Sequence, residues 1–313
     1  MMQNFSHNQT IYKILSGIPE ISQLPNINHI FDIQDGRVRF KIPIAHIHNQ
    51  LTMALRKESV DLTIVQDIPT FHSKKTMPPK IKNIIAIGSG KGGVGKSTIT
   101  YLLAQALHHC GAKVGVLDAD IYGPSQGLLF HLDTKPKITT DKKIIPFNRD
   151  GIQVMSIGVL AQTEKALMWR GPMISQALMQ MYSQTEWQDI DYLLIDLPPG
   201  TGDVHLTLIQ KLALTTNLLI GTPHPLAMLD VNRYKSMLNH LESPILSTIV
   251  NFAENDNPDS DESYAIPMNT AFRDTKAIAH PEFIQLAQHL CAKLTGYSEA
   301  TTNPFDNIQI ATT

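Results

Sequence analysis

A glycine-rich segment between a short apolar run and a longer helical pattern limits the folds open to this 313-residue chain more than any other feature. The apolar run covers residues 83–87, and the helical pattern covers residues 96–110. The segment between them matches the pattern G-x-x-x-x-G-K-[ST] through Gly90, Gly95, Lys96 and Ser97. Glycines let backbone N–H groups converge on phosphate oxygens, and the following helix adds the positive end of its dipole. The sequence therefore predicts a strand, a phosphate-binding loop (P-loop) and a helix in succession.

The residues of the P-loop have separate expected roles. The Lys96 ammonium would neutralise the β- and γ-phosphates of ATP, and the Ser97 hydroxyl would bind Mg²⁺. The residues expected to bind the nucleotide here are Gly90, Lys91, Gly92, Gly93, Val94, Gly95, Lys96, Ser97 and Thr98. The pattern therefore indicates an ATP- and Mg²⁺-binding protein with Lys96 among its catalytic residues.

Short apolar runs alternate with longer helical patterns from residue 83 onward. We expect strands at residues 83–87, 113–118, 152–157, 192–197, 217–222 and 246–251, and helices near residues 96–110, 172–184, 203–213 and 226–241. Several of these strands are almost continuously apolar, which is typical of parallel strands covered on both faces. This predicts an α/β fold with a doubly wound, mostly parallel sheet. In such folds ligands lie at the carboxyl ends of the strands.

Acidic residues follow two of the predicted strands. Asp118 and Asp120 end one strand, and Asp196 ends another. Carboxylates beside a P-loop suit Mg²⁺ and the positioning of water, so we expect Asp118 and Asp196 to bind the metal together with Ser97. Gly200 has no side chain to shield its amide, so we expect that amide to meet the γ-phosphate as a switch. The alternative for Asp118 and Asp120 is a pair that caps the next turn and helix.

The N-terminal part of the chain predicts a small α+β domain with the order helix, strand, strand, helix, strand. Its clearest strand covers residues 37–44, where apolar and basic side chains alternate after a turn at Gly36. We expect this domain at residues 1–68, a polar, proline-rich linker at 69–82, the P-loop ATPase domain at 83–296 and a polar tail at 297–313.

The composition argues against several classes of protein. Lys and Arg total 26 and Asp and Glu total 28, so there is no basic excess of the kind that nucleic-acid binders show. The N-terminus has no secretory signal pattern, and no run approaches the roughly 18 apolar residues that a membrane span needs. We therefore expect a soluble, cytoplasmic protein that binds neither nucleic acid nor membranes.

Four motifs together resemble those of the Mrp/ApbC iron–sulfur cluster carriers, P-loop ATPases related to MinD and ParA. They are Gly-Lys-Gly-Gly-Val-Gly-Lys-Ser-Thr at 90–98, Asp-Ala-Asp-Ile-Tyr-Gly-Pro-Ser at 118–125, Trp-Arg-Gly-Pro-Met at 169–173 and Asp-Tyr-Leu-Leu-Ile-Asp-Leu-Pro-Pro-Gly-Thr-Gly-Asp at 191–203. The resemblance is close over about residues 83–251 and implies a P-loop NTPase fold. In degraded form it extends to residues 7–68, which are similar to the small cluster-assembly domain of this family.

The resemblance also implies roles for single residues. The second lysine of the P-loop, Lys91, marks the deviant loop of this group, in which it reaches across a homodimer to the partner's nucleotide and acts as a catalytic residue. Asp120 would orient the attacking water. Asn251 stands where relatives place an asparagine on adenine, although a hydrogen-bonded asparagine at the edge of the core fits the sequence almost equally well.

The chain lacks the thiol pair of this family. Mrp-type carriers have a Cys-x-x-Cys directly after the strand predicted to end at Asn251, and two such pairs bridge a [4Fe–4S] cluster. Residues 253–266 are acidic here, contain no cysteine and predict a loosely packed loop. The two cysteines of the chain, Cys110 and Cys291, lie on apolar helical stripes and are expected in the core. The sequence therefore counts against an iron–sulfur cluster held by cysteines.

Three further residues attract attention. His46 and His48 continue the apolar face of the strand predicted at residues 37–44, where they would lie roughly 7 Å apart on one side, close enough to share a metal ion. Structural or solvated histidines are the commoner explanation of such an isolated pair. Arg170 is expected near the dimer face, where the sequence assigns it no role.

Two functions fit this sequence. The first is an ATP-binding, slowly ATP-hydrolysing, homodimeric iron–sulfur cluster carrier or assembly protein of the Mrp/ApbC type. The alternative is a cluster-free, ATP-dependent dimer switch that recruits a protein partner, as MinD and ParA relatives do. The missing Cys-x-x-Cys favours the alternative, and the motifs favour the carrier.

Overall fold

The computed structural model describes residues 2–71, 73–160, 171–254, 263–273 and 280–300. Contacts between Cα atoms divide the chain into two compact units. One unit contains the described residues up to Phe71 together with those from Gln288 onward, and the other unit is Ser73–Ala287.

The first unit contains a three-stranded sheet in the order β1-β2-β3. Its elements are α1 (Met2–Ser16), α2 (Pro19–Ser22), β1 (Phe31–Gln34), β2 (Arg37–Phe40), η1 (Ala45–Ile47), α3 (His48–Lys57) and β3 (Thr63–Gln66). β1 and β2 are antiparallel and joined at Asp35 and Gly36, whose φ angles of 52° and 70° suit a tight hairpin turn. β3 lies parallel to β2. This agrees with the predicted order of elements.

The predicted strand over residues 37–44 is shorter in the structure, because β2 ends at Phe40. Pro43 has no N–H to donate to a ladder, and the Ile44 N–H instead donates to the Gln66 side chain at 2.8 Å. His46 therefore lies in η1, and His48 begins α3. The expectation that these two histidines share one side of a strand is wrong.

The second unit is built on an eight-stranded sheet in the order β11-β10-β9-β4-β8-β5-β7-β6. Its strands are β4 (Ile81–Ser89), β5 (Val114–Asp118), β6 (Phe147–Arg149), β7 (Ile152–Ser156), β8 (Ile190–Asp196), β9 (Thr216–Gly221), β10 (Ile245–Ala253) and β11 (Ser263–Pro267). Among these, β6 alone is antiparallel to its neighbour. The predicted doubly wound, mostly parallel sheet is confirmed.

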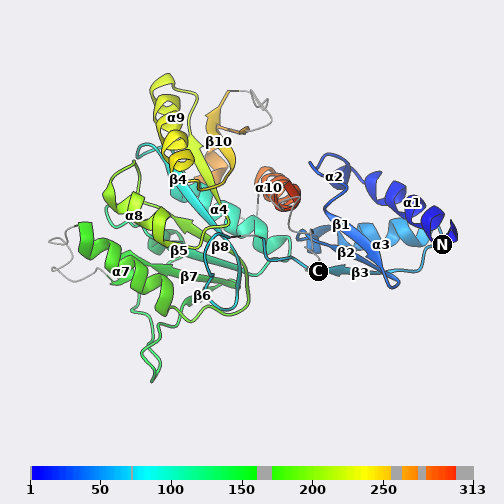
Figure 1. Ribbon diagram of the computed structural model, residues 1–313, viewed down its shortest axis with the longest axis horizontal. Helices are drawn as coiled ribbons and strands as arrows, with labels where there is room; N and C mark the ends of the chain where they lie inside the picture. Colours follow the sequence, from blue (N-terminus) through cyan, green and yellow to red (C-terminus); the bar gives the residue numbers. More distant parts are fainter. Residues whose placement is uncertain (1, 72, 161–170, 255–262, 274–279, 301–313) are drawn as a thin grey trace, which may run out of the picture. The chain divides into compact units, whose positions relative to one another are not determined.

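Helices cover both faces of this sheet (Figure 1). The described helices of this unit are α4 (Lys96–His109), α5 (Gln126–Leu129), α6 (Ile157–Leu160), α7 (Gly171–Gln184), α8 (Asp203–Lys211), α9 (Pro225–His240) and the 3₁₀ turn η3 (Thr270–Arg273). A further helix, α10 (Pro281–Ala300), begins in this unit, and its residues from Gln288 onward belong to the first unit. α7, α8 and α9 share one apolar core with Ile84 and Ala86 of β4. Ile85 and Ile87, which alternate with them along β4, point to the opposite face, and α4 contacts β4, β5 and β8.

The sequence analysis did not predict the two edge strands of the sheet, β6 and β11. β6 has only three residues and β11 follows the polar segment after β10, so neither shows a long apolar run. β11 begins at Ser263, inside the stretch expected to be a loop. Residues 255–262 of that stretch lie outside the described part of the chain.

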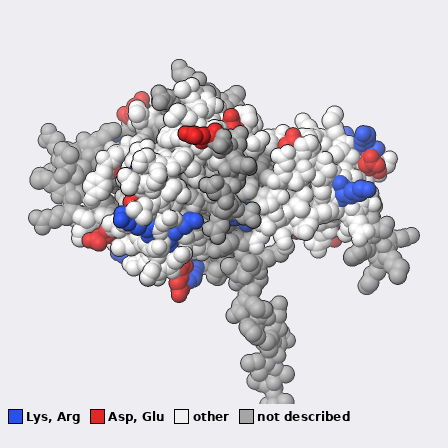
Figure 2. Space-filling model, turned by 90° about the horizontal axis from the view of Figure 1, so that it is seen from above, with Lys and Arg blue, Asp and Glu red and all other residues white. Residues whose placement is uncertain are grey.

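Charged side chains are spread over the described surface in small groups. On the face shown in Figure 2, basic and acidic groups are interspersed among uncharged atoms, and several lie next to one another. Within the ranges that the structure describes, no helix has both the length and the hydropathy of a membrane span.

Lys75 caps the C-terminal end of α8. Its Nζ donates to the carbonyl of Gln210 and lies 3.4 and 3.2 Å from the carbonyl oxygens of Ile209 and Leu212. Carbonyl groups at the end of a helix have no partner within the helix, so a lysine satisfies them and meets the negative end of the dipole.

We expect Lys75→Gln to lower the free energy of unfolding by about 1 kcal/mol, measured by denaturant titration. Lys74→Gln is the matched control, because Lys74 pairs with the exposed Glu242 at 2.6 Å and surface pairs of this kind contribute little to stability. Equal effects of the two substitutions would contradict the capping role of Lys75.

Candidate functional site

The P-loop leaves β4 at Ser89 and enters α4 at Lys96. Gly93 and Gly95 have φ angles of 80° and 88°, which residues with a side chain rarely adopt. A Cβ on Gly95 would lie 2.3 Å from Nδ2 of Asn251, so the loop also needs glycine there for space. A Cβ on Gly93 would meet open space, which leaves the concave side of the loop accessible. The local structure therefore has the form that the pattern predicts.

The sheet aligns the functional residues of four strands. In its register, Ile87 of β4 lies opposite Asp196 of β8, Asp196 opposite Asp118 of β5, and Asp118 opposite Ser156 of β7. Because carboxyl ends of parallel strands meet at one edge, two acidic residues separated by 78 positions become neighbours directly beside the P-loop.

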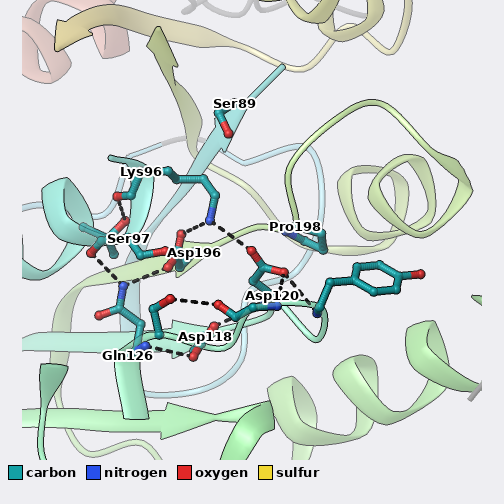
Figure 3. A network of polar contacts seen from close by, with 12 residues as sticks. Ser89, Lys96, Ser97, Asp118, Asp120, Gln126, Asp196 and Pro198 are labelled. Carbon is teal, nitrogen blue, oxygen red and sulfur yellow. Dashed lines mark hydrogen bonds and ion pairs between the residues drawn. The ribbon is translucent and has the colours of Figure 1, made fainter. Parts of the chain in front are cut away.

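Lys96 forms an ion pair with Asp196, and both side chains are buried (Figure 3). A second carboxylate oxygen, Oδ2 of Asp120, lies 3.8 Å from the Lys96 ammonium. Two carboxylates, one at the end of β8 and one shortly after β5, therefore hold the lysine that is expected to bind phosphate.

Asp118 is fully buried and accepts several hydrogen bonds. The Ser156 hydroxyl donates to its Oδ2 at 2.8 Å, and the backbone N–H groups of Gln126 and Asp120 donate at 3.1 and 3.2 Å. Burial, together with the neighbouring charge of Asp196, raises the pKa of the Asp118 carboxyl to about 7 even though these hydrogen bonds lower it. The alternative prediction that Asp118 and Asp120 cap the following turn is also met, because both accept backbone N–H groups there.

Asp120 is held at the wall of a cavity of about 470 Å³. Its Oδ1 accepts the N–H groups of Tyr122 and Gly123, both at 3.2 Å. The same cavity is lined by Ser89, Gly92, Gly93, Gly95, Lys96, Ser97, Thr98, Ser125, Leu128, Leu129 and Pro199. The glycines, Lys96 and Ser97 thus face Asp120 across one space that is large enough for a phosphate chain.

Gln126 is a site residue that the sequence analysis missed. Its side-chain amide donates to Oδ2 of Asp196 at 2.8 Å and to the carbonyl of Ser97 at 2.9 Å, so it links α5, β8 and α4. Its Oε1 is buried and accepts no hydrogen bond from the residues that the structure describes. The motif Gly-Pro-Ser at 123–125 ends just before it, and nothing in the local pattern marks this glutamine as functional.

The donor set suits a hard divalent cation. Carboxylates, a hydroxyl and water are the ligands that Mg²⁺ prefers, and Ser97, Asp118 and Asp196 supply the first two kinds. The unpartnered Oε1 of Gln126 offers a further oxygen beside them. Within the described ranges no group of three or more His, Cys, Asp or Glu residues forms a complete metal site. A cation here would therefore also need oxygens from water or from a bound phosphate.

The remaining predicted residues lie around the P-loop. The Gly200 N–H donates to the carbonyl of Ser89 at 2.8 Å. Asn251 is buried and donates from Nδ2 to the carbonyl of Val94 at 2.9 Å. Lys91 is half-exposed and makes no ion pair with any residue in the described ranges.

A buried histidine connects the segment after Asp196 to α9. His205 lies 3.0 Å from the carbonyl of Pro198 through Nδ1 and contacts the Tyr234 hydroxyl through Nε2. Since a carbonyl only accepts, Nδ1 carries the proton and Nε2 accepts from Tyr234. Burial lowers the pKa of His205 to about 4, and the charge of Lys96 adds to this, so the ring stays neutral. Tyr234 in turn packs against Gly88 of β4, where a Cβ would lie 2.2 Å from its hydroxyl oxygen.

The site can be compared with known proteins. A sequence profile of the ParA type, described as the NUBPL iron-transfer P-loop NTPase, matches residues 80–290. The chain belongs to this NUBPL family. The matched range contains Lys91, Lys96, Asp118, Asp120, Asp196, Gly200 and Asn251. The predicted resemblance to iron–sulfur carrier ATPases is confirmed.

Individual relatives agree with the family. A protein named iron–sulfur cluster carrier protein from Pseudomonas fragi is 49% identical over 175 residues, which are 55% of this chain and 61% of that protein. A carrier of the same name from Rickettsia felis is 38% identical over 255 residues, covering 75% and 80%. Among solved structures, a nucleotide-binding protein from Archaeoglobus fulgidus in complex with ADP matches with a TM-score of 0.53 and 31% identity, covering 67% of this chain and 88% of that one. The match spans less than two thirds of the Pseudomonas protein.

The cysteines of this NUBPL-family chain lie away from the surface. Cys110 at the end of α4 and Cys291 in α10 are both buried, as predicted. β10 runs through Asn251 to Ala253, and residues 252–254 offer no thiol. Arg170 lies outside the described residues.

The low pKa of His205 predicts a specific pH dependence of stability. As pH falls from about 6.5, unfolded chains protonate this histidine while folded chains do so only near pH 4, so folding becomes less favourable across that range. His205→Gln keeps a neutral amide that can donate to Pro198 and accept from Tyr234. We expect the wild type to lose about 3 kcal/mol more stability than this variant between pH 7 and pH 4.

The comparison is made by denaturant unfolding at a series of pH values. Tyr234→Phe is the matched control, because it removes a hydrogen bond to His205 and keeps the histidine buried, so its pH dependence should follow the wild type. Parallel curves for wild type and His205→Gln would show that His205 does not titrate in this way.

Proposed function

We propose that this chain is an ATP-binding, slowly ATP-hydrolysing iron–sulfur cluster carrier that works as a homodimer. The observation that carries the proposal is the meeting of Lys96, Ser97 and Asp120 at one cavity beside the P-loop, where Lys96 is also paired with Asp196. Membership of a family of iron-transfer P-loop NTPases and the names of the Pseudomonas and Rickettsia relatives support it.

Lys96 would bind the phosphate chain. In the present arrangement Asp196 and Asp120 hold its ammonium, so phosphate oxygens must compete with these carboxylates. Ser97, Asp118 and Asp196 would hold Mg²⁺, directly or through water, and the ion would supply positive charge to the β- and γ-phosphates. Asp196, which pairs with Lys96, would then be shared between that ammonium and the cation.

Asp120 would orient the attacking water, since its Oδ1 is fixed by two backbone N–H groups and the residue lines the cavity. Gly200 would sense the γ-phosphate with its amide. That amide now donates to Ser89, so binding phosphate would exchange one hydrogen bond for another and move the segment around Pro198. His205 joins that segment to Tyr234 on α9 by hydrogen bonds, so a movement of the segment would also displace α9.

Lys91 would complete the site of a second copy of the chain. Its ammonium is half-exposed and makes no ion pair with the described residues, so it is available to a nucleotide outside its own subunit. A lysine that arrives from a partner stabilises the charge that develops during phosphoryl transfer, as an arginine finger does.

A second candidate function arises from the question of whether the chain can bind an iron–sulfur cluster. A [4Fe–4S] cluster needs thiolates, and the two cysteines of this chain are buried on α4 and α10. This favours a cluster-free, ATP-dependent dimer switch that recruits a protein partner. The family membership favours the carrier, and both functions use the same nucleotide site.

The trans role of Lys91 predicts complementation between two inactive variants. Lys96→Ala should abolish ATP binding, because the P-loop would lose the ammonium expected to neutralise the β- and γ-phosphates, while Lys91→Ala should bind ATP normally and lack hydrolysis. Mixed dimers of the two should regain hydrolysis, because the Lys96→Ala subunit still lends Lys91 to the intact P-loop of its partner.

Phosphate release by each variant alone and by the mixture is the measurement, with Lys113→Ala as a surface control whose ion pair to Asp189 is exposed. A mixture as inactive as its components, in the presence of dimers, would contradict the trans role. Normal ATP affinity of Lys96→Ala would contradict the P-loop assignment itself.

Anaerobic reconstitution with iron and sulfide separates the two candidate functions. A carrier should retain about four irons per dimer and show a broad visible absorption band. Cys291→Ser and Cys110→Ser should then tell which thiol takes part. Colourless, iron-free protein that still binds ATP would leave the dimer switch.

A further inference from the structure

Phe252 adopts a backbone conformation that is costly for an aromatic residue. Its φ angle is 60°, in the left-handed region, although it lies within strand β10 (Ile245–Ala253). The pairing of β10 with β11 shifts between Asn251 and Ala253, so Phe252 is the extra residue of a β-bulge. Bulges next to functional sites commonly re-aim a side chain. The ring is 39% exposed, and in the described ranges no other aromatic ring stacks on it.

The bulge places Phe252 beside the P-loop. A Cβ built on Gly95 would lie 3.7 Å from Cζ of the Phe252 ring and 2.3 Å from Nδ2 of Asn251. Asn251 also donates to the carbonyl of Val94. The end of β10 is therefore attached to the last residues of the P-loop, and the aromatic ring stands next to that attachment with part of its surface open.

The strand order determines which part of a nucleotide lies at this position. The acidic residues stand on one side of β4, with Asp196 on β8 and Asp118 on β5, and the cavity that suits phosphate extends toward them. β10 stands on the other side of β4, two strand spacings or roughly 10 Å away. A triphosphate whose terminal end points at the carboxylates must extend its sugar and base in the opposite direction, toward Asn251 and Phe252.

We propose that Phe252 is the stacking platform for the purine base of the bound nucleotide. This inference rests on the proposed ATP binding and adds a residue that the motifs do not contain. Stacking on an aromatic face is tolerant of the identity of the base, so Phe252 adds affinity for nucleotides in general. It also gives a physical reason for an exposed aromatic residue at a strained backbone position, because such strain persists where function uses it.

Calorimetric titration of Mg²⁺-ATP and of Mg²⁺-tripolyphosphate into wild type and Phe252→Ala tests the proposal. Loss of an aromatic platform typically costs a base about 5- to 150-fold in affinity. We expect a loss in that range for ATP and an unchanged affinity for tripolyphosphate, which has no base. Phe252→Trp should retain the wild-type affinity for ATP.

Two further variants separate stacking from a structural role. Phe252→Gly suits the φ angle of 60° better than Phe252→Ala, so it should melt at a higher temperature than the alanine variant and yet bind ATP equally weakly. Tyr122→Ala removes a 74% exposed aromatic residue that lines the phosphate cavity, and it should leave the ATP-to-tripolyphosphate affinity ratio unchanged.

The outcomes that overturn the proposal are distinct. Wild-type ATP affinity in Phe252→Ala, an equal loss for ATP and tripolyphosphate, or a selective loss of ATP binding in Tyr122→Ala would each remove Phe252 from the base site. A wild-type protein that binds neither ligand would instead overturn the proposed nucleotide function, and the stacking role with it.

Discussion

The buried ion pair between Lys96 and Asp196 is the interaction on which the arrangement of the site depends. Two charges out of water are tolerated only when they are paired and their remaining hydrogen-bonding capacity is satisfied. Gln126 therefore donates to the second oxygen of Asp196, while Ser156 and backbone N–H groups surround the adjacent Asp118. The same pair places the P-loop lysine beside the carboxylates that are expected to hold Mg²⁺. A phosphate group that binds Lys96 would therefore have to compete with Asp196 for its ammonium.

The two sides of the P-loop have different chemistry. On the side of β8 and β5 the carboxylates and Gln126 suit the metal and the terminal phosphate, and His205 ties the segment after Asp196 to α9. On the side of β10 an amide and an aromatic ring, Asn251 and Phe252, stand against Gly95. A nucleotide bound across the loop would contact both sides at once. Loss of its terminal phosphate would therefore change the contacts of both the segment that His205 joins to α9 and the end of β10.

The chain combines a formed P-loop with buried cysteines. The P-loop and the acidic residues beside it lie within the range that the family profile matches, and Gly93 and Gly95 have the positive φ angles of such a loop. Cys110 and Cys291, by contrast, are buried. Because thiolates are the usual ligands of an iron–sulfur cluster, the structure supports the nucleotide site more directly than a cluster site.

Local patterns alone determined most of the fold and the P-loop. Continuous apolar runs predicted the inner strands. The P-loop pattern before α4, and Asp118 and Asp196 at strand ends, predicted the site, because parallel strands bring their carboxyl ends together. Short edge strands carry no such signal, and Pro43 ended the strand that would have aligned two histidines.

Only the tertiary structure revealed the contacts of Gln126, His205 and Phe252. These contacts depend on neighbours that are distant in the sequence or on an unusual backbone angle, and none of them leaves a periodic pattern in the chain.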